Sequence, residues 1–173
     1  GLGDVYKRQI NGPGPKVSPD HFGQLTRYFK DHLGPDDLVF LAGNIAPGMT
    51  KDHYQAIANL VKKAGSQLVV DTNTDLLTAS LAYQPFLIKP NIHELGDIFG
   101  VQLKTGSEAL PYAKKLQEAG AKHILLSMGG EGALLLKEDG QVLRAQSPKG
   151  QVVNPSGAGD SMLAGFIACL WDK

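Results

Sequence analysis

The glycine-rich turn Asn154-Pro155-Ser156-Gly157-Ala158-Gly159-Asp160 holds residues whose types and spacing suit the binding of an anion. It follows the apolar pair Val152-Val153 and leads into an apolar segment that predicts a helix from about Gly157 to Trp171. Minimal side chains let an anion approach the main chain, and the free amides at a helix N-terminus point towards it. We therefore expect an anion to bind where this turn enters the helix.

Asp160 is an unusual residue for a turn that only binds an anion, because its carboxylate repels one. The conflict disappears if Asp160 accepts a proton from a substrate hydroxyl while the amides hold a phosphoryl group in transfer. A second interpretation stays open from the turn alone: the glycines form a tight turn, and Asp160 only complements the helix dipole. The turn is neither a Gly-Lys-Ser/Thr phosphate loop nor a G-x-G-x-x-G dinucleotide motif.

The segments before this turn alternate between short apolar runs and helical patterns. Leu38-Val39-Phe40-Leu41-Ala42 is typical of a strand that is buried on both faces. Further strands are expected at 68–70, 86–88 and 123–127, a hairpin at 132–136 and 141–145, and helices at about 19–33, 54–64, 74–82, 92–99 and 105–119. This order predicts an α/β fold with a mainly parallel sheet covered on both faces, whose ligands bind beyond the carboxyl ends of the strands.

The start of the helix at about 105–119 and the position of Cys169 need separate consideration. Thr105 and Glu108 form a capping box, but Pro111 then lies beyond the first turn, so the helix either starts later, near Ser107, or kinks. Cys169 is the single cysteine, and we expect it to be a small buried residue on the last helix. One thiol excludes an internal disulfide and a multi-cysteine metal site, which favours a reducing, cytoplasmic setting.

Bulk composition narrows the classes of partner. The chain has 173 residues, 42% of them hydrophobic and 20% charged, which is ordinary for a globular domain. Lys plus Arg and Asp plus Glu number 17 each, so no basic excess favours nucleic acid or an anionic membrane. No stretch reaches the ~18 apolar residues of a membrane span. The five histidines show no ligand spacing, so we expect no zinc site.

Four motifs in order resemble those of the ribokinase-like (PfkB) carbohydrate kinases. Gly157-Ala158-Gly159-Asp160 matches the family's GAGD turn, and the other matches are Gly43-Asn44-Ile45-Ala46-Pro47-Gly48, Lys89-Pro90-Asn91-Ile92-His93-Glu94-Leu95 and Ser127-Met128-Gly129-Gly130-Glu131-Gly132-Ala133. The resemblance covers the chain from Ile10 to Trp171 and is strongest to the hexose-phosphate branch, which includes 1-phosphofructokinase and tagatose-6-phosphate kinase. It implies a three-layer α/β/α fold that is incomplete here, since the family's N-terminal strands and β lid would precede it.

The resemblance also implies a reaction: transfer of the γ-phosphoryl group of MgATP to a hydroxyl of a ketohexose phosphate such as fructose 1-phosphate or tagatose 6-phosphate. Asp160 would be the general base on the acceptor, and the amides of Gly157, Ala158 and Gly159 would hold the γ-phosphoryl group. Asn44 would lie near the sugar phosphate, and Glu94 would order Mg²⁺ through water. The expected nucleotide side comprises Lys89, Asn91, Ser127, Gly129, Gly130, Glu131, Gly132 and Gly159.

Plain alternatives accompany several of these residues. Lys89 and Glu94 could be surface charges, Asn91 could simply cap a helix, and Asp71 could either end its strand or face the site. His93 is expected at the surface. A non-catalytic nucleotide or sugar-phosphate binding module of the same fold is the alternative to a kinase.

The ends of the chain and its assembly carry further expectations. Residues 1–9 resemble a translated adapter, so we expect residues 10–173 to be the C-terminal, nucleotide-binding portion of a kinase domain. Because the resemblance places the sugar-gripping Asp and Gly-Gly-Lys segments upstream, little or no activity is expected of this chain alone. For the complete protein a homodimer is the expected assembly.

Overall fold

The structure is a computed structural model that describes residues 14–147 and 157–171; Val152-Val153, Asn154-Pro155-Ser156 and the proposed boundary after residue 9 lie outside these ranges. The helices are α1 (Pro19–His32), α2 (Lys51–Ala64), α3 (Thr74–Ser80), α4 (Ile92–Phe99), α5 (Gly106–Glu118) and α6 (Ala158–Trp171), with the short 3₁₀ helices η1 (Leu81–Tyr83) and η2 (Gly129–Glu131). The strands are β1 (Leu38–Gly43), β2 (Gln67–Thr72), β3 (Leu87–Ile88), β4 (His123–Ser127), β5 (Ala133–Leu136) and β6 (Val142–Ala145).

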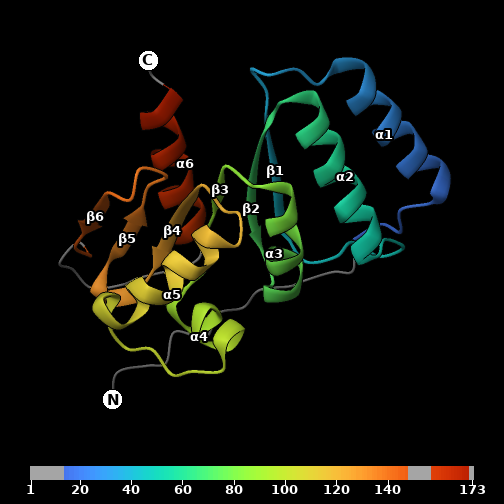
Figure 1. The fold of residues 1–173 in the computed structure, drawn as a ribbon. Coiled ribbons are helices and arrows are strands. Elements are labelled where there is room, and N and C mark those ends of the chain that lie inside the picture. Colours follow the sequence, from blue (N-terminus) through green and yellow to red (C-terminus); the bar gives the residue numbers. More distant parts are fainter. Residues whose placement is uncertain (1–13, 148–156, 172–173) are drawn as a thin grey trace.

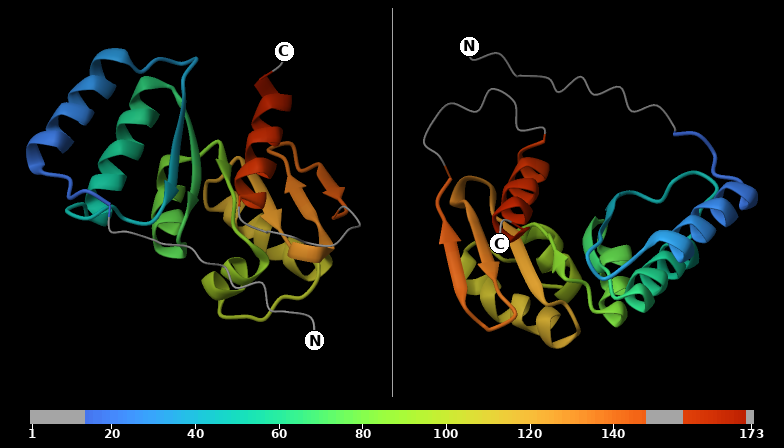
Figure 2. Two further views of the ribbon diagram at one scale, coloured as in Figure 1. Left: turned by 180° about the vertical axis from the view of Figure 1, so that it is seen from behind. Right: turned by 90° about the horizontal axis from the view of Figure 1, so that it is seen from above.

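The six strands of the described residues form one sheet in the order β1-β2-β3-β4-β5-β6 (Figure 1). Strands β1 to β4 run parallel, and the β5–β6 hairpin adds two antiparallel strands. Helices α1 to α5 lie on one face of the sheet and α6 on the other, as two views of the ribbon show (Figure 2). The predicted three-layer α/β/α arrangement with a mainly parallel sheet is thus confirmed.

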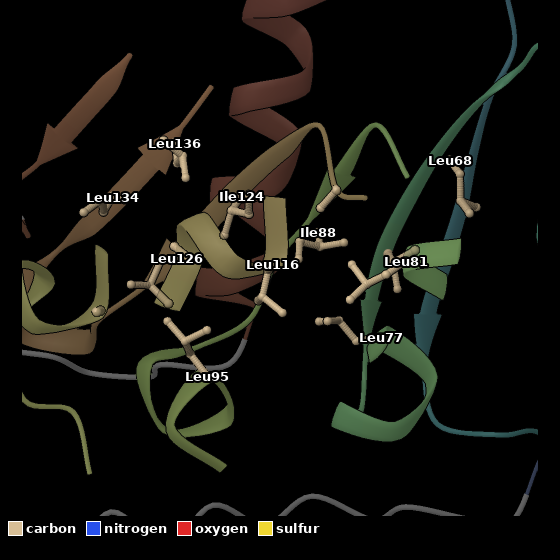
Figure 3. Packing of buried hydrophobic residues seen from close by; sticks show 14 of the residues in the cluster. Leu68, Leu77, Leu81, Ile88, Leu95, Leu116, Ile124, Leu126, Leu134 and Leu136 are labelled. Atoms are coloured by element: carbon tan, nitrogen blue, oxygen red, sulfur yellow. The ribbon is translucent and has the colours of Figure 1, made fainter. Parts of the chain in front are cut away.

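Successive side chains of the central strands point to opposite faces of the sheet, so each face has its own hydrophobic core. In β2, Leu68 and Val70 face the large core against α2 to α5, whereas Val69 faces the smaller core against α6. In β4, Leu125 takes the α6 side. Figure 3 shows the larger core, to which the sheet contributes Leu68, Ile88, Ile124, Leu126, Leu134 and Leu136. Apolar residues at consecutive positions of β2 and β4 follow from this burial on both faces.

Strand β1 forms where it was predicted, but the expectation that it is buried on both faces is wrong for the described residues. Val39 and Leu41 pack against the large core, while Phe40 keeps 46% of its surface exposed. The cause is position: β1 is an edge strand of the sheet that the described residues form, and on its α6 side Leu38 packs against the smaller core whereas Phe40 does not. An apolar run alone does not distinguish a central strand from an outer one.

The structure also answers the questions about α5 and Cys169. Helix α5 begins at Gly106 with both hydrogen bonds of the Thr105–Glu108 capping box, and it continues through Pro111. The later start near Ser107 is therefore wrong. Cys169 is exposed, contrary to the prediction, since only one side of α6 packs against the sheet.

Candidate active site

The carboxyl ends of the parallel strands bring the predicted site segments to one edge of the sheet. The register pairs Gly43 of β1 with Thr72 of β2, Val70 with Ile88 of β3, and Ile88 with Ile124 of β4. The motifs that follow β1, β3 and β4 therefore begin at the same edge. The N-terminus of α6 joins them, as the contacts of Gly159 below demonstrate.

Asp71 and Lys89 form an ion pair at this edge. Residues 69, 71, 87 and 89 share the face that α6 covers, and the parallel register continues beyond β3 because the Lys89 amide donates to the Val70 carbonyl oxygen at 3.0 Å. The Lys89 Nζ atom lies 3.0 Å from Asp71 Oδ1, with the two side chains only 11% and 21% exposed. Lys89 is thus not an ordinary surface charge, and Asp71 lies within β2 with its side chain paired to Lys89 on the side of the sheet that α6 covers.

The ammonium group of Lys89 also lies against the first turn of α6. A Cβ atom placed on Gly159 would be 3.1 Å from Lys89 Nζ. Asp160 follows in the same turn and is exposed. Because a helix N-terminus carries partial positive charge, a lysine beside it raises the local positive potential instead of complementing the dipole. Such a combination of amides and ammonium suits a bound anion.

Asn91 and Glu94 are engaged with each other at the start of α4. The Asn91 side-chain oxygen accepts hydrogen bonds from the His93 and Glu94 amides, and Glu94 Oε2 accepts from the Asn91 amide at 2.7 Å. The capping interpretation of Asn91 is therefore confirmed. His93 is exposed, as expected. The second carboxylate oxygen of Glu94 has no hydrogen bond among the described residues and could accept one from a metal-bound water.

This donor set fits Mg²⁺ only in its usual water-rich form. No group of three or more His, Cys, Asp or Glu side chains that could hold a metal occurs in the part of the chain that the structure describes. Mg²⁺ needs no protein cage, since it commonly keeps several waters and binds one or two carboxylates together with substrate phosphates. A single half-buried carboxylate such as that of Glu94 is compatible with that mode of binding.

The segment from Ser127 to Gly132 lies directly beside Asn91. Ser127 forms a parallel bridge with Asn91 and donates its amide to the Pro90 carbonyl oxygen at 3.1 Å. Residues Gly129, Gly130 and Glu131 form η2 and are exposed. Gly132 has φ +87°, and a Cβ atom there would overlap the Ala145 carbonyl oxygen, so only glycine lets this turn pack on β6.

Asn44 occupies the same sheet edge at a different place. It is exposed directly after β1, and its carbonyl oxygen accepts a hydrogen bond from the Tyr54 hydroxyl at 3.1 Å. The contacts of the described residues join Lys89 to Asp71 and Gly159, and Asn91 to Glu94 and Ser127. No hydrogen bond or ion pair in those ranges links the Asn44 side chain to either group.

The sequence profile of the pfkB family carbohydrate kinases matches residues 7–173, nearly the whole chain. The chain belongs to this family. As regards membranes, none of the helices in the described ranges combines the length and apolar character of a bilayer span.

Individual pfkB-family relatives extend the comparison. The chain is 43% identical over 160 residues to a 1-phosphofructokinase from Bacillus subtilis, covering 92% of this chain and 52% of that protein. It is 32% identical over 160 residues to a D-tagatose-1-phosphate kinase from Bacillus licheniformis, again with 92% and 52% covered. Phosphofructokinase-2 from Escherichia coli, solved with substrates and products, superimposes with a TM-score of 0.83 at 26% identity, covering 93% of this chain and 52% of that one. The chain thus spans about half the length of these relatives.

Proposed function

We propose that the complete protein is an ATP-dependent kinase that phosphorylates a ketohexose phosphate, with fructose 1-phosphate as the first candidate acceptor. The substrate choice rests on the 43% identity to a 1-phosphofructokinase, and the 32% identity to a D-tagatose-1-phosphate kinase makes a tagatose phosphate the second candidate. The proposal includes a cytoplasmic location and assembly as a homodimer.

The position of Lys89 is the observation that carries the proposal. Its ammonium group lies beside Gly159 in the first turn of α6 and is paired with Asp71, so a nearly buried cation lies at the N-terminus of a helix. Without an anion, this arrangement opposes the helix dipole. A transferring γ-phosphoryl group would satisfy the Lys89 ammonium together with the amides of Gly157, Ala158 and Gly159.

Asp160 is proposed as the general base. Its exposed carboxylate in the same helical turn would accept the proton of the acceptor hydroxyl as the hydroxyl oxygen attacks the γ-phosphorus. The bond from that phosphorus to the bridging oxygen breaks, and ADP leaves with the bond's electron pair. The amides and Lys89 stabilise the charge on the phosphoryl oxygens, so positioning and electrostatics supply most of the catalysis.

The remaining residues divide between nucleotide and sugar. Ser127, Gly129, Gly130, Glu131 and Gly132 would border the nucleotide next to Asn91, and Asn44 would lie at the sugar phosphate. Glu94 would hold Mg²⁺ through a water molecule, and the bound ion would neutralise charge on the nucleotide phosphates. The capping bond between Glu94 and the Asn91 amide supports this role, because it fixes the carboxylate at the end of β3.

Asp160→Asn in the complete protein tests this assignment. We expect turnover with ATP and fructose 1-phosphate to fall about 10²- to 10⁴-fold while ATP still binds, since only the proton acceptor is lost. Asp52→Asn is the matched control, because Asp52 is an exposed carboxylate in the first turn of α2. Unchanged turnover in Asp160→Asn would contradict the proposed base. A wild-type protein that binds ATP but phosphorylates neither candidate sugar would instead indicate a binding module.

A further inference from the structure

The loop after β1 is clamped by a tyrosine whose hydroxyl forms two hydrogen bonds with the main chain of that loop. The Tyr54 hydroxyl on α2 donates to the Asn44 carbonyl oxygen at 3.1 Å and accepts from the Ala46 amide at 3.2 Å. A phenol has one proton to donate, and here it goes to the loop. The hydroxyl proton is therefore committed to the main chain of the loop and is not available to a ligand.

Packing of the Tyr54 ring holds the hydroxyl group in place. Tyr54 is half-buried and lines a small, mostly apolar cavity together with Leu41, Val70 and Leu76. Displacing the ring would open this contact between α2, the sheet and α3. Tyr54 thus connects the core to the loop, because its rigid ring packs in the cavity and its hydroxyl binds the main chain at Asn44.

The rest of the loop is also fixed in one conformation. The Val17 amide donates to the Pro47 carbonyl oxygen at 2.8 Å, and the Met49 amide donates to Ala46 at 2.9 Å. Gly48 has φ +84°, and a Cβ atom there would overlap the Val17 carbonyl oxygen. Between Gly43 and this packed corner, the bonds of Tyr54 hold the stretch from Asn44 to Ala46, in which Asn44 and Ile45 are exposed and Ala46 is half-buried.

We infer that Tyr54 is a positioning residue for the acceptor side of the site: it orders the main chain at Asn44 and thereby favours binding of the sugar phosphate. This inference rests on the proposed function, since it assigns the loop to the sugar phosphate. Ordering the loop before binding removes an entropic penalty that would otherwise weaken the affinity. The Lys89–Asp71–Gly159 group lies on other elements, so the nucleotide side does not depend on this clamp.

Tyr54→Phe in the complete protein is the central test, because it removes the hydroxyl and keeps the ring. We expect the KM for fructose 1-phosphate to rise about five- to tenfold, from loss of the clamping hydrogen bonds. The KM for ATP and kcat should stay within about twofold. Tyr83→Phe is the matched control: Tyr83 lines the same cavity, and its hydroxyl makes no hydrogen bond within the described residues.

A second readout does not depend on catalysis. The Ala46 amide loses its acceptor in Tyr54→Phe, so its hydrogen exchange should accelerate several-fold, with no such change in Tyr83→Phe. Gly48→Ala perturbs the same loop from its other side and should also raise the sugar-phosphate KM selectively.

The two proposals fail in different ways. Faster Ala46 exchange with an unchanged sugar-phosphate KM, or an equal rise in both KM values, would overturn the positioning role. Unchanged Ala46 exchange would overturn the clamp itself. A wild-type protein without sugar-phosphate kinase activity would contradict the proposed function, and the exchange experiment would still decide whether Tyr54 clamps the loop.

Discussion

Lys89 Nζ lies 3.0 Å from Asp71 Oδ1 although the two residues come from different strand ends, and the same ammonium group contacts the position of a Gly159 side chain. Three segments far apart in the sequence thus meet through one lysine. The attraction to Asp71 offsets the free-energy cost of removing the Lys89 ammonium from water. The ion pair also holds this ammonium beside the N-terminus of α6.

A double-mutant cycle on this ion pair should give a coupling of about 1–2 kcal/mol in the free energy of unfolding, because both partners are largely buried. Asp71→Asn alone should lower the free energy of unfolding by more than this coupling energy. It leaves the Lys89 ammonium, whose side chain is only 11% exposed, without its partner. Urea unfolding of Asp71→Asn, Lys89→Met and the double variant measures this.

The exposed pair Lys122–Glu138 is the internal control for that cycle. Its atoms are 3.8 Å apart, and its side chains are 40% and 60% exposed. We expect its coupling to be below about 0.5 kcal/mol, as for other surface pairs. Equal couplings for the two pairs would contradict the special position of Lys89.

Gly159→Ala should separate stability from activity. The new Cβ atom would press on Lys89 Nζ at 3.1 Å, so the lysine must move by a few tenths of an ångström from the anion site. We expect phosphoryl transfer by the complete protein to fall at least tenfold with little change in stability, because the contact is with the end of a flexible side chain. Gly165→Ala in the same helix has no atom within 4 Å of its Cβ atom, and it should stabilise by ~0.5–1 kcal/mol at full activity.

The helix cap at Asn91 and the helix after the Gly-rich turn could be predicted from the sequence because both depend on neighbouring residues. The Asn91 cap and the start of α6 depend on residues three or four positions apart, and both form where predicted; the reciprocal bond from Glu94 was not predicted. The same holds for the Thr105–Glu108 box, although Pro111 made its helix uncertain.

The Asp71–Lys89 pair and the exposure of β1 could not be predicted with the same certainty. The pair depends on the register between β2 and the two-residue strand β3, which no local pattern specifies. Phe40 is exposed because β1 lies at an edge of the sheet in the described part of the chain, and a continuous apolar run looks alike at the centre and at the edge of a sheet. The Tyr54 clamp likewise joins positions 8 and 10 residues apart through packing of a helix on a loop.

The β5–β6 hairpin should weaken at acidic pH through Asp139. Hydrogen bonds from the Gln141 amide and then from Lys137 lower the pKa of the Asp139 carboxyl below its ordinary value of 3.8. A lowered folded-state pKa means that the stabilising contribution is complete above about pH 3.8 and is lost as the pH falls through the folded value.

This contribution is measured by comparing the free energy of unfolding of the wild-type protein with that of Asp139→Asn between pH 2 and pH 7. The wild-type protein should be the more stable of the two at neutral pH, and the difference should shrink below about pH 3.8. Glu138→Gln is the control. Glu138 is next to Asp139 in the sequence, but the Gln141 amide donates its hydrogen bond to Asp139 and not to Glu138. A difference that grows on acidification would contradict the assignment.

The 173-residue chain by itself should bind ATP and yet show little or no sugar-phosphate kinase activity. Lys89 and Asn91, which are assigned to the nucleotide, and Glu94, which is assigned to Mg²⁺, all belong to this chain, whereas the chain spans 52% of the 1-phosphofructokinase that it resembles. Titration with ATP and a coupled ADP assay with fructose 1-phosphate, run beside the complete protein, test both halves of the prediction. Lys89→Met in the chain should weaken ATP binding, which ties the binding to this site. Robust turnover by the chain alone would show that the acceptor sugar is held by these residues without further segments.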